Sequence, residues 1–181
     1  MSSTAAGHEP LGGAVEAMRT LFAAAACSIA LVDAEGEVLE FVASSGSGER
    51  EIIGVSIPVG RGIAGWAAMS GQPIAVRDVQ VDARFARDVA ESTHYVPTAI
   101  YAAPLLGQDG DVLGVASVLD PVVDQSSDWA LTVLGAMAGL LALVVVVHTQ
   151  GPAARAPLDR LGADVLRLVE AWRDEPGQGR A

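Results

Sequence analysis

The sequence has no lysine, no asparagine and only one cysteine, Cys27. A lone cysteine cannot close an internal disulfide, which fits the reducing environment of the cytoplasm. The first ten residues lack a basic start followed by an apolar run, so they do not resemble a secretory signal. We therefore expect a cytoplasmic protein.

Aromatic residues are scarce as well. Only 4% of the 181 residues are aromatic, although 51% are hydrophobic. The chain is long enough to bury one sizeable core and to leave a tail over. That core must consist mainly of alanine, valine, leucine and isoleucine.

Positive charge is outnumbered, because 11 arginines face 22 acidic residues and the formal net charge is −11. Such an acidic chain repels phosphate backbones, which excludes nucleic acid as a partner. The histidines, His8, His94 and His148, are far apart, and no carboxylate pair or metal-ligand spacing accompanies them. We therefore expect no metal site and no catalytic residues, and we expect that the protein is not an enzyme.

The hydrophobic pattern predicts an α+β fold with a central antiparallel sheet of about six strands. Turn signals at residues 33–37 and 108–111 each join two apolar segments into a hairpin, and sequential hairpins imply antiparallel pairing. The predicted strands are 27–32, 38–43, 52–59, 73–76, 99–106 and 112–119. The predicted helices are 11–26, 62–70, 126–148 and 158–173.

The same pattern divides the chain into one domain and a tail. The predicted parts are a disordered N-terminus at 1–9, a domain at 10–148, a linker at 149–157, an amphipathic helix at 158–173 and a disordered tail at 174–181. Within the domain, the helices at 11–26 and 126–148 would cover one face of the sheet. The segment 60–97 would cover the other face and leave a pocket beneath it.

One uncharged run, residues 129–147, is long enough to span a bilayer. It contains Gly135 and Gly139, a spacing found where transmembrane helices pack closely. We favour a domain helix that is buried on several sides, because the run belongs to a layer of the predicted domain. A membrane span is the alternative interpretation.

Three stretches together resemble the GAF domain family. They are Pro58-Val-Gly-Arg-Gly-Ile-Ala-Gly-Trp-Ala-Ala-Met-Ser-Gly-Gln-Pro73, then Val76-Arg-Asp78 with Asp82-Ala-Arg-Phe85, then Ile100-Tyr-Ala-Ala-Pro104-Leu with Gly110-Asp-Val-Leu-Gly114-Val-Ala-Ser-Val. The resemblance extends over about residues 10–148, in the order typical of the family. It implies a GAF/PAS-like fold and a non-catalytic sensory or regulatory module.

The resemblance also implies a ligand pocket between the sheet and the segment 60–97. An alternative is that the same side chains pack together and fill the space, which would leave a pure protein-interaction module. The residues expected to line the pocket are Ile29, Leu31, Phe41, Ile63, Trp66, Phe85, His94, Tyr95, Tyr101 and Ser117.

Several ligand classes of the family find little support in these residues. Cyclic-nucleotide GAF domains carry an Asn-Lys…Phe…Asp-Glu signature. This chain has no Asn and no Lys, and Phe85, Asp88 and Glu91 match the rest of the signature only loosely. Bilin-binding members attach the pigment to a Cys that precedes a His, whereas Thr93 precedes His94 here. The methionine sulfoxide reductases of the family need a reactive and a resolving thiol.

Haem is a further alternative, with His94 as the axial ligand. His94 stands ten residues before Pro104, as a histidine does in haem-binding GAF sensor kinases. We otherwise expect no cofactor.

The long apolar helix also predicts a homodimer, since a helix that is apolar all round must be buried on every side. The expected partners are therefore a small molecule or a signalling protein, and a second copy of the chain. The residues expected at the dimer interface are Gly135, Ala138, Gly139, Leu161, Val165 and Leu168.

Overall fold

The computed structural model describes residues 9–122 and 129–150. Its six strands are β1 (Ala26–Val32), β2 (Val38–Gly46), β3 (Ser56–Pro58), β4 (Ile74–Val76), β5 (Ile100–Leu106) and β6 (Val112–Leu119). They form one antiparallel sheet in the order β3-β2-β1-β6-β5-β4. The helices are α1 (Glu9–Leu21), α2 (Glu49–Ile52), α3 (Gly62–Ser70), η1 (Val79–Val81), α4 (Arg87–Ser92) and α5 (Trp129–Gln150).

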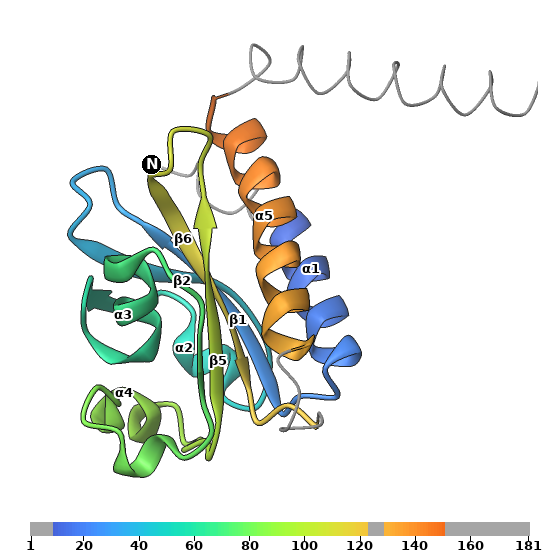
Figure 1. The fold of residues 1–181 in the computed structure, drawn as a ribbon. Coiled ribbons are helices and arrows are strands. Elements are labelled where there is room, and N and C mark those ends of the chain that lie inside the picture. The colour runs from blue at the N-terminus through green and yellow to red at the C-terminus, as the bar shows by residue number, and fades with distance from the viewer. Residues whose placement is uncertain (1–8, 123–128, 151–181) are drawn as a thin grey trace, which may run out of the picture. The chain divides into compact units, whose positions relative to one another are not determined.

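The expected α+β architecture is confirmed. Helices α1 and α5 lie together on one face of the sheet, and α2, α3 and α4 lie on the other (Figure 1). The predicted left-handed cap of α3 is also present, because Gly71 has φ 64° and its N–H bonds to the carbonyl of Ala67.

Three predicted boundaries were wrong. The first helix ends at Leu21 rather than Ala26, since Ala23 adopts a left-handed backbone with φ 44°. The second strand runs on to Gly46 instead of giving way to a loop at residue 44, because its last residues stay paired with β1. The third strand begins only at Ser56, because residues 49–52 form α2.

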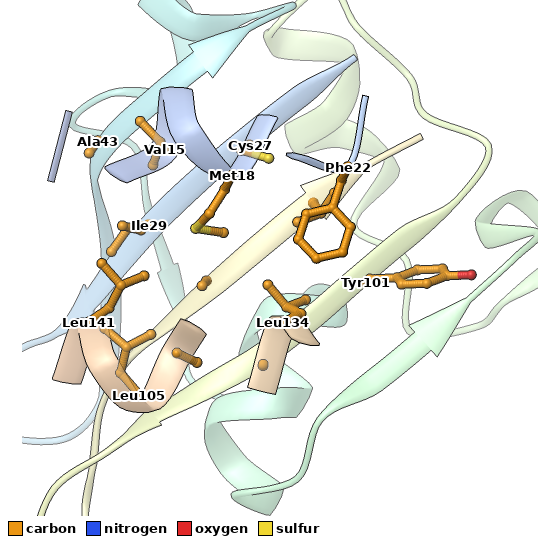
Figure 2. Close-up of a cluster of buried hydrophobic side chains, with 14 of the residues drawn as sticks. Val15, Met18, Phe22, Cys27, Ile29, Ala43, Tyr101, Leu105, Leu134 and Leu141 are labelled. Atoms are coloured by element: carbon orange, nitrogen blue, oxygen red, sulfur yellow. The ribbon is translucent and has the colours of Figure 1, made fainter. Parts of the chain in front are cut away.

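A core between the sheet and helices α1 and α5 is built mostly from aliphatic side chains, as the composition predicted. Figure 2 shows Val15 and Met18 of α1, and Phe22 just after it, facing Cys27 and Ile29 of the sheet. We call this cluster the helix-side core. It also includes Ala43, Tyr101, Ala103, Leu105, Ala116, Val118, Ala130, Leu134, Ala138, Leu141, Ala142 and Val145.

The opposite face of the sheet carries a second core, which we call the cavity-side core. Residues of β1, β2, β5 and β6 pack there against α3. Its buried members are Ala30, Leu39, Phe41, Ile57, Ile63, Ala64, Ala67, Ala68, Val76, Val79, Ala102 and Val115. The sheet is thus buried on both faces, which explains why its central strands read as nearly continuous apolar runs.

A β-bulge in β2 decides which of its residues face the cavity. Ile29 pairs with Ala43, but the next residue of β1, Ala30, pairs with Phe41, so Val42 is the extra residue. Because strand side chains alternate between faces, one extra residue reverses the alternation. As a result Phe41 and Ser44, three residues apart, both lie on the cavity side.

Helix α5 is buried along one side and exposed along the other. Leu134, Ala138 and Leu141 belong to the helix-side core, whereas Leu140 and Trp129 are largely exposed. Residues 129–147 are long and apolar enough to cross a membrane by length and composition, and 33% of their most apolar stretch is buried inside the protein. The buried side of α5 packs against the sheet of the domain.

The predicted parts at 1–8 and 151–181, including the amphipathic helix, lie outside the described residues.

Candidate functional site

A partly enclosed cavity lies between the sheet and the segment that carries α2, α3 and α4. Its volume is about 100 Å³, below the range of about 300–1,000 Å³ typical of sites for drug-sized ligands. Strands β1, β2, β5 and β6 form the floor. The lining residues are Ala26, Cys27, Ser28, Phe41, Ser44, Ser47, Gly48, Ile52, Ile57, Gly62, Ile63, Ala64, Phe85, Ala86, Val89, Ala90, Thr93, Tyr95, Pro97, Ile100, Ser117 and Leu119.

None of the described lining residues carries a charged side chain, and most are apolar. The polar groups of the floor come from a row of serines on three adjacent strands. Ser28 on β1 pairs with Ser44 on β2 and with Ser117 on β6. Residues paired in this way point to the same face of the sheet. The floor therefore presents three hydroxyls side by side in an otherwise apolar setting.

Two of these hydroxyls lack a protein partner. Ser44 donates its hydroxyl to the carbonyl of Cys27 at 3.2 Å. Ser28 and Ser117 are only 6% and 4% exposed, and neither hydroxyl makes a hydrogen bond to any of the described residues. Since no fully buried side-chain oxygen among these residues lacks a partner, both hydroxyl oxygens must be accessible from the cavity. Water or a ligand in the cavity can therefore supply the hydrogen-bond partner that the protein does not.

The first turn of α3 forms part of the cavity wall. Gly62, Ile63 and Ala64 all line the cavity, and the cap residue Arg61 provides no side-chain hydrogen bond. The N–H groups at the start of an α-helix have no partner within the helix. The first N–H bonded in this helix is that of Gly65, which donates to the carbonyl of Arg61 at 3.1 Å.

The roof is held by side chains on its outer surface. Arg61, just before α3, forms an ion pair with Asp88 of α4, and this guanidinium lowers the pKa of the Asp88 carboxyl. Tyr95, in the loop after α4, donates its hydroxyl to the carboxylate of Asp120 at the end of β6. Burial, together with this hydrogen bond, raises the pKa of Tyr95 above its ordinary value.

Five of the ten residues expected to line the pocket do line it: Phe41, Ile63, Phe85, Tyr95 and Ser117. The prediction was wrong for the three strand residues Ile29, Leu31 and Tyr101, which belong to or pack against the helix-side core. Figure 2 shows the Tyr101 hydroxyl pointing away from this cluster.

The physical reason for these errors is register. Tyr101 pairs with Val118, so it lies on the face opposite to Ser117, and Ile29 lies on the face opposite to Ser28. Ser28 and Ser44 were missed for the same reason. A polar residue within the apolar run Ala26–Val32 was the signal that could have identified Ser28.

The other two expected lining residues also lie elsewhere. The Trp66 ring lies under the guanidinium of Arg84, 5.0 Å from the ring centroid, and Trp66 does not line the cavity. His94 is exposed, with φ 57°, and is absent from the cavity wall. The residues present therefore do not fit haem, because the cavity is small and His94 does not face it.

Cys27, the single cysteine of the chain, offers little reactivity. It borders the cavity, but its side chain is fully buried in the helix-side core. Burial raises the pKa of the Cys27 thiol to about 12, which leaves it protonated at neutral pH. Among the described residues, no group of three His, Cys, Asp or Glu could hold a metal ion.

The exposed side of α5 is the second candidate surface. Of the expected interface residues, Ala138 was wrong, because it is fully buried against the sheet of its own chain. Gly139 is exposed, and Gly135 is half-buried. Leu161, Val165 and Leu168 lie outside the described residues. The exposed side is instead formed by Trp129, Thr132, Ala136, Gly139, Leu140 and Leu143, which we call the outer face of α5.

Comparison with known proteins identifies the fold and the family. The model of the GAF domain family matches residues 8–145. A cGMP-specific 3',5'-cyclic phosphodiesterase of Drosophila mojavensis is 36% identical over 66 residues, which are 36% of this chain and 6% of that protein. The chain thus corresponds to a small part of the curated relatives it matches.

Two solved structures share the fold. The GAF domain of a phosphoenolpyruvate-protein phosphotransferase from Coxiella burnetii superposes with a TM-score of 0.70 at 17% identity, covering 80% of this chain and 86% of that one. A free methionine-R-sulfoxide reductase from Neisseria meningitidis, in complex with its substrate, gives 0.65 at 21% identity, covering 82% and 83%. At these identities the likeness establishes the fold alone.

Proposed function

Because this chain belongs to the GAF domain family, we propose that it is a non-catalytic sensory module that binds a small uncharged molecule and signals through its helical face. The observation that carries this proposal is the cavity on the sheet, whose described lining holds unpaired hydroxyls and no charged side chain. Binding sites of this kind are mostly apolar, with a few polar groups that fix the ligand's orientation.

The preference for an uncharged ligand rests on magnitudes. A helix N-terminus such as that of α3 stabilises a nearby anion by about 0.3–1 kcal/mol. Moving an ion out of water costs several kcal/mol unless a counter-charge is provided. No cation lines the cavity among the described residues, so the helix alone would not offset that cost. The same argument disfavours cyclic GMP, the nucleotide in the name of the phosphodiesterase relative.

The absence of catalysis is likewise a proposal, supported by the state of Cys27. A reductase of this fold would need an accessible thiolate, whereas this thiol is buried and has a pKa raised to about 12. A free cysteine also supports a cytoplasmic location.

We propose that the functional unit is a homodimer joined through the outer face of α5. Leu140 is 66% exposed, and its neighbours on this face, Ala136, Gly139 and Leu143, carry no charge. A contiguous apolar surface of this kind marks an interaction site in a soluble protein. The small residues Ala136 and Gly139 would let two helices approach closely.

A continuous set of contacts links the cavity to this face. Tyr95 lines the cavity and bonds to Asp120. Two residues later, the Val122 N–H donates to the carbonyl of Phe22 at 3.0 Å, and the Phe22 ring lies 6.4 Å from that of Trp129, the first residue of α5. Occupation of the cavity would therefore bias the position of α5 through neighbouring groups.

Native mass spectrometry of the protein purified from its own host tests both parts of the proposal. We expect a dimer that retains a small neutral molecule. Ala90→Leu, which places a larger side chain at the cavity wall, should lose the molecule and keep the fold. A native protein without any bound molecule, which also gains no stability from a library of neutral metabolites, would favour the collapsed pocket of a pure interaction module.

The dimer has its own test in two matched charge substitutions. Leu140→Glu should convert the dimer to monomer in light scattering, because it buries a charge in the proposed interface. Met69→Glu, at a residue of α3 that is 61% exposed on the other side of the sheet, is the control and should leave the dimer intact. Equal behaviour of the two variants would rule out this interface.

A further inference from the structure

We infer that the cavity recognises a neutral hydrogen-bond acceptor, such as the carbonyl of a small amide or ketone, and holds it between the serine pair Ser28–Ser117 and the first turn of α3. This inference rests on the proposed ligand-binding function and adds the chemical class of the ligand. Two independent features of the cavity carry it.

The first feature is the serine pair. Ser28 and Ser117 lie opposite each other on β1 and β6, both are more than nine-tenths buried, and both line the cavity. A serine hydroxyl can donate one hydrogen bond and accept two. Since no described residue forms a hydrogen bond with these hydroxyls and their oxygens are not fully buried, they remain available to a molecule in the cavity.

The second feature is the wall opposite the sheet. The residues of the first turn of α3 that line the cavity, Gly62, Ile63 and Ala64, offer only N–H donors. Gly62 can bring its backbone close because it has no side chain, and an added Cβ would lie 3.2 Å from that of Ala86. Its φ of 71° also disfavours any other residue.

Together these groups favour an acceptor over a donor. The backbone N–H groups can only donate, and the two hydroxyls can rotate to donate as well. The backbone carbonyls of β1 and β6 are engaged in the sheet ladder, so few acceptors remain for a donor ligand. A carbonyl oxygen can accept two hydrogen bonds, one from the wall and one from the floor.

The size and lining of the cavity limit the rest of the ligand. A volume of about 100 Å³ suits a fragment of a few heavy atoms. Phe41, Ile63 and Ile100 line the cavity and would contact its apolar part. A short aliphatic amide meets these conditions, whereas its carboxylate and amine counterparts carry a charge that no side chain in the lining balances.

The test compares four probes on the full chain by two-dimensional NMR: butanamide, butanoate, butylammonium and xenon. We expect butanamide to shift the amide signals of Gly62, Ile63 and Ala64, and to bind at least tenfold more tightly than butanoate or butylammonium. Ser28→Ala and Ser117→Ala should each weaken butanamide binding about fivefold, the loss of one neutral hydrogen bond. Ser56→Ala is the matched control, because this exposed serine of β3 lies outside the cavity lining, and it should change the affinity less than twofold.

The outcomes separate this inference from the proposed function. Equal affinities for butanamide and butanoate, or butanamide binding that is insensitive to both serine substitutions, would overturn the inference and leave a ligand-binding cavity. Xenon binding alone would indicate an apolar cavity and would also overturn it. If no probe, xenon included, shifts the signals of the cavity, both the inference and the proposed ligand-binding function are wrong.

Discussion

Tyr95 and Asp120 join two parts of the chain that the sequence separates by 25 residues. The carboxylate of Asp120 accepts the Tyr95 hydroxyl through one oxygen, and through the other it accepts the backbone N–H groups of Thr98 and Ala99 at 2.8 and 2.7 Å. Asp120 itself has φ 49°, a left-handed backbone that Asp tolerates better than most residues. One side chain thus ties the loop over the cavity to the end of β6.

This arrangement predicts that Asp120 stabilises the loop more than Tyr95 does. Asp120→Ala removes three hydrogen bonds and should destabilise the fold by about 2 kcal/mol or more, while Tyr95→Phe should cost about 1 kcal/mol. Hydrogen exchange at the amides of Thr98 and Ala99 should accelerate strongly only in Asp120→Ala. Asp120→Asn, which keeps the backbone preference and one acceptor, is the control and should fall between the two. Unchanged exchange in Asp120→Ala would contradict the assignment.

Substitutions of Gly139 should affect the stability of the monomer and the stability of the dimer differently. An added Cβ at this position would meet nothing within 4 Å, so Gly139→Ala should raise the stability of the monomer by up to about 1 kcal/mol through helix propensity. Gly139→Leu should also fold, yet weaken a close-packed helix pair. Thermal unfolding at low concentration and light scattering at high concentration measure the two effects. A dimer that tolerates Gly139→Leu would place the interface elsewhere.

The Cys27 thiol should be unreactive in the native protein. Its pKa of about 12, raised by burial from 9.0, leaves a far smaller thiolate fraction at pH 8 than in an exposed cysteine. Reaction with a thiol-specific reagent should be at least about 100-fold slower in the native state than in urea. Cys27→Ala should retain the fold. Rapid native labelling, or thiol-dependent reduction of methionine sulfoxide that Cys27→Ala abolishes, would contradict the non-catalytic proposal.

The elevated pKa of Cys27 also predicts that the stability of the fold decreases at alkaline pH. A folded-state pKa above the unfolded one favours folding while the thiol is protonated, and this contribution is lost as the pH rises from about 9 to about 12. Cys27→Ala should therefore unfold less steeply with pH in this window than the native chain does.

At low pH, Asp82 is a group whose shifted pKa makes the stability of the fold depend on pH. Hydrogen bonds from the Arg84 side chain and backbone lower its pKa from 3.8 to about 2. A lowered folded-state pKa stabilises the fold above the unfolded pKa, and this contribution is lost as the pH falls from about 4 to about 2. Asp82→Asn should flatten the pH dependence of the unfolding free energy there, by less than about 1 kcal/mol because Arg84 is partly exposed. An identical acid profile in the variant would contradict this assignment.

The fold was predictable because its signals are local. The segment 62–70 was expected to be a helix closed by Gly71, and both features are present. Helix α2 was missed because four residues, 49–52, within a Gly- and Ser-rich stretch carry too little periodicity to distinguish a short helix from a loop.

The cavity lining was harder to predict, because the face of the sheet on which a strand residue lies depends on how the strands pair. The expected lining took Ile29 together with Phe41, which the alternation of two unbulged strands would allow. The extra residue at Val42 makes that pair incompatible, and no sequence signal marks the bulge. On α3 the prediction was right for Ile63 but wrong for Trp66, whose ring lies under the guanidinium of Arg84 instead.

The bulge at Val42 also gives β2 one residue of tolerance in its length. If Val42 were deleted, Phe41 could stay opposite Ala30 and Ala43 opposite Ile29, because the extra residue has no partner of its own on β1. Phe41 and Ser44 would then be two residues apart and would still share the cavity side of the sheet. Deletion of a regularly paired residue elsewhere in the strand would instead turn the positions beyond it to the opposite face. Related chains should therefore tolerate the loss of one residue between Phe41 and Ala43 better than at any other point of this strand.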